Sequence, residues 1–74
     1  MRMISRDQLQ RLREAYPKGS RVELVQMADL QAPPIGTCGT VIGVDDLGSI
    51  MVRWDNGSGL SVAWGEDICR RIDR

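Results

Sequence analysis

The sequence predicts one small domain that is mainly β, with a single α-helix at its N-terminus. Its 74 residues are enough for one hydrophobic core, and an apolar content of 42% suits a globular chain rather than a disordered one. Helical spacing of apolar residues is confined to residues 5–16, whereas short β-branched segments separated by Gly, Asp and Asn fill residues 20–72. We therefore expect a single domain over residues 1–74.

The N-terminal helix is predicted by its capping pattern and by one apolar stripe. Ser5 is a good N-cap, and Gln8, three residues later, is the partner that a capping box requires. Leu9 and Leu12 follow at helical spacing, and Pro17 ends the helix because the residue before a proline disfavours the α conformation. We expect this helix to cover one end of the β part. The alternative is a helix that binds a partner or forms a homodimer.

Five short segments have the composition of β-strands. The turn between the second and third lies at residues 45–48. The next turn contains Asn56 and Gly57, a pair that predicts a type I′ hairpin with positive φ at both residues. Residues 63–67 predict a single 3₁₀ turn. The expected strands are residues 21–25, 40–44, 50–54, 58–62 and 68–72.

These elements together predict a small five-stranded SH3-like barrel with one N-terminal α-helix. A long first loop over residues 26–37, two tight hairpins and a one-turn element before the last strand match that fold, and closure removes exposed sheet edges. Trp54 is expected in the core. Cys38 and Cys69 are expected to be small buried hydrophobic residues, because the chain has no His and no Cys-x-x-Cys spacing for zinc.

Motifs along most of the chain carry a family resemblance. Residues 16–25, 33–41, 43–48 and 52–58 resemble a family of small uncharacterised domains of bacteria, phages and mobile elements, labelled as domains of unknown function. This resemblance implies a phage or mobile-element origin, and with it a small oligomeric inhibitor or sequestering protein as one hypothesis. Residues 36–57 are also similar to the mind-bomb-type domain, which implies an SH3-like barrel that binds peptides.

Catalysis and metal binding are not predicted. The chain has no His, no Gly-x-Ser-x-Gly nucleophile motif and no phosphate-binding Lys after its glycine-rich stretch at residues 36–39. Asp45 and Asp46 precede the third strand while Asp55 follows it, so one ion cannot reach both turns, and turn formation explains these residues. We expect no enzyme activity, no cofactor and no metal.

Protein or peptide binding is the favoured function. In an SH3-like arrangement the first loop, the 45–48 turn and the 63–67 element border one groove, which would place a tryptophan among five carboxylates. Such a groove suits a basic or arginine-containing peptide. The alternative is a core tryptophan surrounded by solvated acidic residues. The predicted binding residues are Trp64, Asp29, Asp45, Asp46, Glu66 and Asp67.

Nucleic-acid binding is the second hypothesis. The formal net charge is zero, which argues against a DNA-coating protein, but cations gather near both ends and a closed barrel would join them into one basic face. There is no apolar stretch of membrane-spanning length and no signal-peptide pattern, so we expect a cytoplasmic protein without membrane contact. The basic face consists of Arg13, Lys18, Arg21, Arg70 and Arg71.

Overall fold

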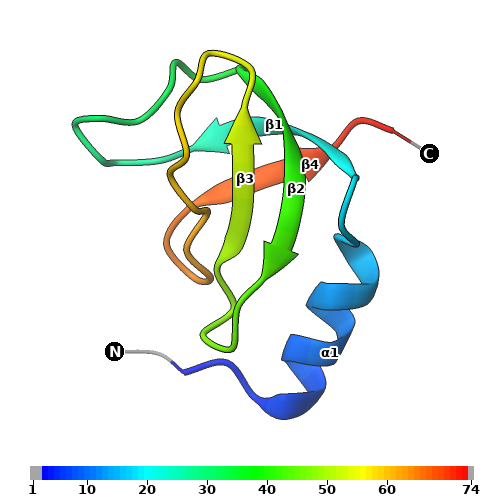
Figure 1. Cartoon of the computed structure of the whole chain (residues 1–74). Helices are drawn as coiled ribbons and strands as arrows, with labels where there is room; N and C mark the ends of the chain where they lie inside the picture. Colours follow the sequence, from blue (N-terminus) through cyan, green and yellow to red (C-terminus); the bar gives the residue numbers. More distant parts are fainter. Residues whose placement is uncertain (1–2, 74) are drawn as a thin grey trace.

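The fold is one helix beside a four-stranded antiparallel sheet (Figure 1). The computed structural model describes residues 3–73, and it confirms the prediction of a mainly β chain with an N-terminal helix. No helix within these residues is long and apolar enough to cross a membrane. The elements are α1 (Arg6–Ala15), β1 (Arg21–Gln26), β2 (Cys38–Val44), β3 (Ile50–Trp54) and β4 (Ile68–Arg71).

The sheet has the strand order β3-β2-β1-β4, and each neighbouring pair is antiparallel. Val22 of β1 lies between Gly39 of β2 and Arg71 of β4. The first and last strands are therefore neighbours, as the sequence predicts. The sheet remains open, because β3 and β4 form its two edges.

The prediction of five strands in a closed barrel is wrong in its strand count. Residues 58–62 do not form a strand and retain a single antiparallel bridge between Val62 and Ile50. The Trp54 indole N–H donates to the Leu60 carbonyl at 2.8 Å, so the segment is held to the tryptophan ring rather than in a ladder. Gly57 and Gly59 also weaken strand formation here.

The tight turns differ from the predicted types. Gly48 and Gly57 have positive φ, and within residues 3–73 only glycines do, so Asn56 cannot supply the first left-handed position of a type I′ turn. Each glycine N–H instead donates to the carbonyl three residues earlier, as in a type I turn followed by a left-handed glycine. Gly65 also has positive φ, so residues 63–66 form a type II turn and not the predicted 3₁₀ turn.

The core lies on one face of the sheet. Trp54 is buried there as predicted, and Cys69 is buried beside Leu24. Cys38 is only half-buried, contrary to expectation, because it is paired with Glu23 on the opposite face of the sheet. The buried hydrophobic residues are Val22, Leu24, Val41, Ile50, Val52, Trp54, Val62 and Cys69.

Helix α1 begins with the predicted capping box, in which Ser5 and Gln8 exchange side-chain to backbone hydrogen bonds. No residue of the helix is fully buried. The helix is attached by hydrogen bonds to the rest of the fold: Arg13 donates to the Val44 carbonyl, and the Tyr16 hydroxyl donates to the Cys69 carbonyl at 3.3 Å. These contacts hold α1 beside β2 (Figure 1), and Tyr16, which follows the helix, reaches β4.

Candidate functional site

Five of the six predicted binding residues line two adjoining hollows rather than one groove. The first, called here the apolar hollow, has a volume of about 220 Å³ and lies between the N-terminal segment, the β2–β3 turn and the 63–66 turn. Its lining residues are Met3, Ile4, Asp46, Leu47, Ser49, Ala63, Trp64 and Glu66.

The second, called here the acidic hollow, has a volume of about 410 Å³ and lies between the loop after β1 and residues 60–67. Ala63 and Glu66 line both hollows, so the two adjoin at that turn. The lining residues of the acidic hollow are Met27, Ala28, Asp29, Leu60, Ser61, Ala63, Glu66 and Asp67.

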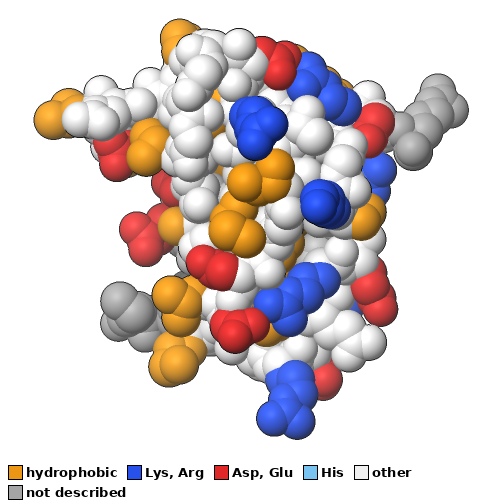
Figure 2. Space-filling view, viewed as in Figure 1, with side chains coloured by type: hydrophobic (Ala, Val, Ile, Leu, Met, Phe, Trp, Pro, Cys, Tyr) orange, Lys and Arg blue, Asp and Glu red, His pale blue; other side chains and the backbone are white. Residues whose placement is uncertain are grey.

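Trp64 is half-buried and lines the apolar hollow. It is positioned by Gly48, where an added Cβ would lie 2.9 Å from Ile4 Cδ1 and 3.1 Å from Trp64 Cβ. Around it, Met3 and Leu47 are 80% and 73% exposed, which is unusual for large hydrophobic side chains that lie close together. Figure 2 shows hydrophobic side chains beside acidic ones at the lower left, where the β2–β3 turn lies in Figure 1.

Three of the predicted carboxylates, those of Asp29, Asp45 and Asp67, accept hydrogen bonds from the backbone of their own turns. Asp45 Oδ1 accepts from the N–H groups of Leu47 and Ser49 at 3.0 and 2.9 Å. Asp67 Oδ2 accepts from the N–H of Ala63 at 2.9 Å and so closes the turn that carries Trp64. Asp45 lines neither hollow, whereas Asp67 contributes one side of the acidic hollow.

The predicted carboxylates are available to a ligand to different degrees. Asp46 is paired with Arg13, with 2.8 Å between Oδ1 and Nη2, and Asp29 Oδ1 accepts from the N–H of Gln31 at 2.7 Å. The Glu66 side chain is exposed and has no hydrogen-bond or ion-pair partner among residues 3–73. Glu66 is therefore the carboxylate best placed to meet a charge in either hollow.

The predicted basic face consists largely of ion pairs. Arg21 forms two hydrogen bonds with the Asp55 carboxylate, at 2.9 and 2.6 Å, and Arg70 pairs with Glu23 across β1 and β4. Arg71 pairs with Asp73 at 2.8 Å, and Arg13 pairs with Asp46. Of the five predicted cations, Lys18 alone has no such partner within residues 3–73.

These pairs shift the proton affinities of their members. The hydrogen bond from Arg21 lowers the pKa of Asp55, and the hydrogen bond from Arg71, followed by that from the Arg21 N–H, lowers the pKa of Asp73. The carboxylates thus hold the arginines in place on the sheet surface, and the basic face is locally neutralised.

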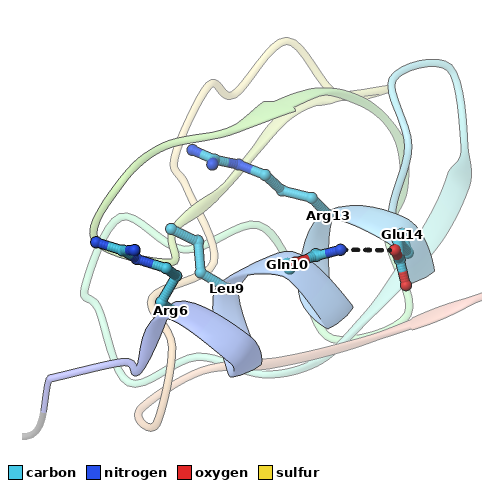
Figure 3. Close-up of a pocket in the computed structure, with 5 residues that line it drawn as sticks. All are labelled: Arg6, Leu9, Gln10, Arg13 and Glu14. Atoms are coloured by element: carbon cyan, nitrogen blue, oxygen red, sulfur yellow. Dashed lines mark hydrogen bonds between the residues drawn. The ribbon is translucent and has the colours of Figure 1, made fainter.

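A further hollow of about 380 Å³ lies on the surface of α1. Figure 3 shows that its five lining side chains all come from the helix, with the Leu9 side chain between those of Arg6 and Arg13. Gln10 Nε2 donates to Glu14 Oε2 at 3.4 Å along the same helix. Because only residues of α1 line this hollow, we interpret it as a shallow depression between side chains of one helix rather than as a binding site.

The sequence interpretation missed the apolar half of the site. Leu47 was overlooked as a binding residue, although a leucine in a turn of Asp and Gly residues is itself unusual and marks an exposed apolar position. No comparable sequence signal marks Met3 as an exposed binding residue, because its exposure depends on the path of the chain before α1. Among the described residues, no three Cys, Asp or Glu side chains come together to hold a metal ion.

The comparisons agree with the predicted resemblance to uncharacterised small domains. A family model described as "Domain of unknown function (DUF4314)" matches residues 5–72 of the 74-residue chain. Neither the curated proteins nor the solved structures give a match. With both α1 and the complete sheet inside the matched range, the chain belongs to the DUF4314 family.

Proposed function

We propose that this domain is a non-enzymatic binding module that takes a hydrophobic side chain of a protein partner into the apolar hollow. The observation that carries this proposal is the exposure of Met3 and Leu47 beside Trp64 in a hollow of about 220 Å³. Large apolar side chains grouped around a concavity mark interaction surfaces, because each loses water contact when a partner binds.

The size of the apolar hollow favours a side chain over a cofactor. Small-molecule sites usually enclose about 300–1,000 Å³, and the apolar hollow is smaller than that. A single leucine or methionine side chain, supplied by a longer peptide, suits a hollow of this size. The rest of the peptide would then lie across the rim.

The rim favours a partner with basic residues next to its hydrophobic anchor. Asp46 and Glu66 line the apolar hollow, and no Lys or Arg among residues 3–73 does. A carboxylate at a half-exposed rim attracts and orients an arginine, which adds specificity more than affinity. Because Asp46 is already paired with Arg13, Glu66 would make the main charged contact.

The strand order supports an SH3-like interpretation of the fold within this proposal. The sheet has the order β4-β1-β2-β3, and Val62 bridges to Ile50 on the far side of β3. An SH3-like barrel has the same order with a full fourth strand at that position, so this fold corresponds to such a barrel with its fourth strand reduced to one bridge. Peptide binding does not follow from the fold, and it is argued here from the apolar hollow alone. Nucleic-acid binding is less favoured, because four of the five predicted cations are already in ion pairs.

A titration with short peptides tests the proposal. A peptide with one leucine between two pairs of arginines should shift the ¹⁵N-HSQC signals of Leu47 and the Trp64 indole, and the same peptide with glutamates in place of the arginines should bind more weakly. Leu47→Asp should abolish binding because it places a charge in the apolar hollow. The matched control is Leu30→Asp, at a leucine that is 103% exposed and lines neither hollow.

Retained binding by the Leu47→Asp protein would contradict the proposal. If Leu30→Asp abolished binding as well as Leu47→Asp, the loss would not be specific to the apolar hollow, and this would also contradict the proposal. Far-UV circular dichroism of each variant checks that the fold survives, which is expected because both leucines are exposed.

A further inference from the structure

The edge of the β structure at Ser61 is open. Val62 donates its N–H to the Ile50 carbonyl at 2.8 Å and accepts from the Ile50 N–H at 2.9 Å. Because backbone groups of successive residues in an extended segment point to opposite sides, the N–H and C=O of Ser61 face away from β3. Neither group has a hydrogen-bond partner within residues 3–73.

This open edge borders the acidic hollow. Ser61 lines the hollow on one side, and Met27 and Ala28 line it from the loop after β1. The backbone groups of Met27 and Ala28 also have no hydrogen-bond partner in the described part of the chain. The acidic hollow thus lies between two stretches of unpaired backbone, which is the environment in which an added strand satisfies its own N–H and C=O groups.

The charges of the acidic hollow indicate which strand would enter it. Within the described part of the chain, three of its lining residues are acidic and none is basic. Asp29 and Asp67 each use one carboxylate oxygen for a backbone N–H and leave the other without a partner among residues 3–73, and Glu66 leaves both. Arginine or lysine side chains would complement this set, and an acidic segment would be repelled.

We propose that the bound partner is an extended, basic peptide segment that pairs with the Ser61 backbone as an added β-strand and places an arginine or lysine in the acidic hollow. This inference rests on the proposed function, since the hydrophobic anchor of the same segment occupies the apolar hollow. The two hollows adjoin at Ala63 and Glu66, so a segment that crosses this turn would extend from one hollow to the other. Hydrogen bonds to the Ser61 backbone would fix the register of the bound peptide, and the carboxylates of the acidic hollow would select basic residues in it.

Alternate N-methylation of the peptide tests the backbone pairing. In an added strand, only every second peptide N–H faces the edge to which it bonds. Two versions of the arginine–leucine–arginine peptide, methylated on the odd or on the even backbone nitrogens, should therefore differ in affinity by about tenfold. The unmodified peptide should also move the Ser61 amide proton downfield, because that group gains a hydrogen bond.

The charge is tested by Glu66→Gln, which should weaken binding of the arginine peptide several-fold and weaken binding of a leucine peptide without lysine or arginine much less. Its matched control is Glu14→Gln on the surface of α1, outside both hollows, which should bind both peptides normally. A Glu66→Gln protein that binds the arginine peptide as tightly as the parent would overturn the basic partner.

The outcomes separate this inference from the proposed function. If both methylated peptides bind equally and the Ser61 amide does not move, while Leu47→Asp still abolishes binding, the strand pairing is wrong and the apolar hollow stands. If no leucine-containing peptide binds the parent protein at all, both are wrong. A difference between the methylated peptides, together with a shifted Ser61 amide, supports the added strand.

Discussion

Gly39 shows how one missing side chain sets the packing of the core. It lies on β2 directly opposite Trp54 of β3. A Cβ atom at Gly39 would lie 2.6 Å from Val52 Cγ1 and 2.9 Å from Trp54 Cε3, closer than carbon atoms approach without displacement. The tryptophan ring can therefore lie flat against β2 only because this residue has no side chain, and its indole N–H then reaches Leu60.

Replacing Gly39 by Ala should reduce the free energy of unfolding by about 1–3 kcal/mol, because Val52 and the Trp54 ring must move to accommodate one methyl group. Urea denaturation followed by tryptophan fluorescence measures the change. Gly59→Ala is the control: an added Cβ there meets nothing within 4 Å, so stability should change by less than about 0.5 kcal/mol. Equal effects at the two positions would contradict the packing described.

At the scale of single elements, the two adjacent acidic residues of the β2–β3 turn, Asp45 and Asp46, have different partners. Asp45 accepts two backbone N–H groups and so fixes the turn, while the neighbouring Asp46 is 94% exposed and pairs with Arg13. The turn holds Leu47 outward and places Gly48 beneath Ile4 and Trp64. The shape of the apolar hollow thus depends on Asp45, although Asp45 does not line it.

Asp45→Ala should destabilise the domain by about 1–2 kcal/mol, because two backbone donors lose a charged acceptor. Asp46→Ala should cost less than about 1 kcal/mol, since exposed ion pairs contribute little. Thermal unfolding of the two variants gives the comparison. If Asp46→Ala were the more destabilising change, the assignment of Asp45 to the turn would be wrong.

At the scale of the whole molecule, Arg21 connects parts of the chain that are distant in sequence. Its guanidinium holds Asp55 beyond the end of β3, and its backbone N–H donates to Asp73 Oδ2 at 2.9 Å beyond the end of β4. Arg71 holds the other oxygen of Asp73. One edge of the sheet is thereby linked to the other through side chains on the sheet's outer face.

The lowered pKa values of Asp55 and Asp73 predict how these links respond to acid. Both carboxylates stabilise the fold when ionised, so their contribution is complete above the ordinary value of 3.8 and is lost as the pH falls through their lower folded-state values. Asp55→Asn combined with Asp73→Asn should therefore lose less stability than the parent on acidification below pH 3.8.

Urea denaturation at a series of acidic pH values measures this difference, and 1 M salt should reduce it because these groups are exposed. Glu14→Gln, which removes a carboxylate from α1, serves as the control. An acid response identical in the double variant and the parent would show that the pairs do not contribute to stability.

The sequence predicted the helix and most of the strands correctly, but it did not predict that the sheet stays open. Ser5 and Gln8 fixed the start of α1, and the alternation around Val22 and Leu24 identified a half-buried strand, because caps and residue periodicity are local properties. The prediction of a fifth strand failed for two reasons, of which the glycines at positions 57 and 59 are visible in the sequence and a contact with Trp54 is not. The Trp54 indole binds the Leu60 carbonyl, and nothing in residues 58–62 themselves reveals that contact.

The structure gathers five of the six predicted binding residues around two adjoining hollows, where the sequence predicted one groove. Trp64, Asp46 and Glu66 do line one hollow, as the expected groove required, and Asp29 and Asp67 line the next. Charge alone could not tell that Asp45 and Asp67 are occupied by backbone donors. It also could not tell that Arg21 and Arg70 have carboxylate partners, since those pairs depend on strand register.

The attachment of α1 has a consequence for how freely this sequence can diverge. The acceptors for Arg13 and Tyr16 are main-chain carbonyls, at Val44 and Cys69, and the Arg71 side chain likewise donates to the carbonyl of Ala15. Every residue type carries that carbonyl, so replacing Val44 or Cys69 leaves the acceptor in place. These hydrogen bonds therefore do not depend on the side chains at residues 44 and 69. A substitution there that still fills the core leaves the helix attached, provided that the two arginines and the tyrosine remain.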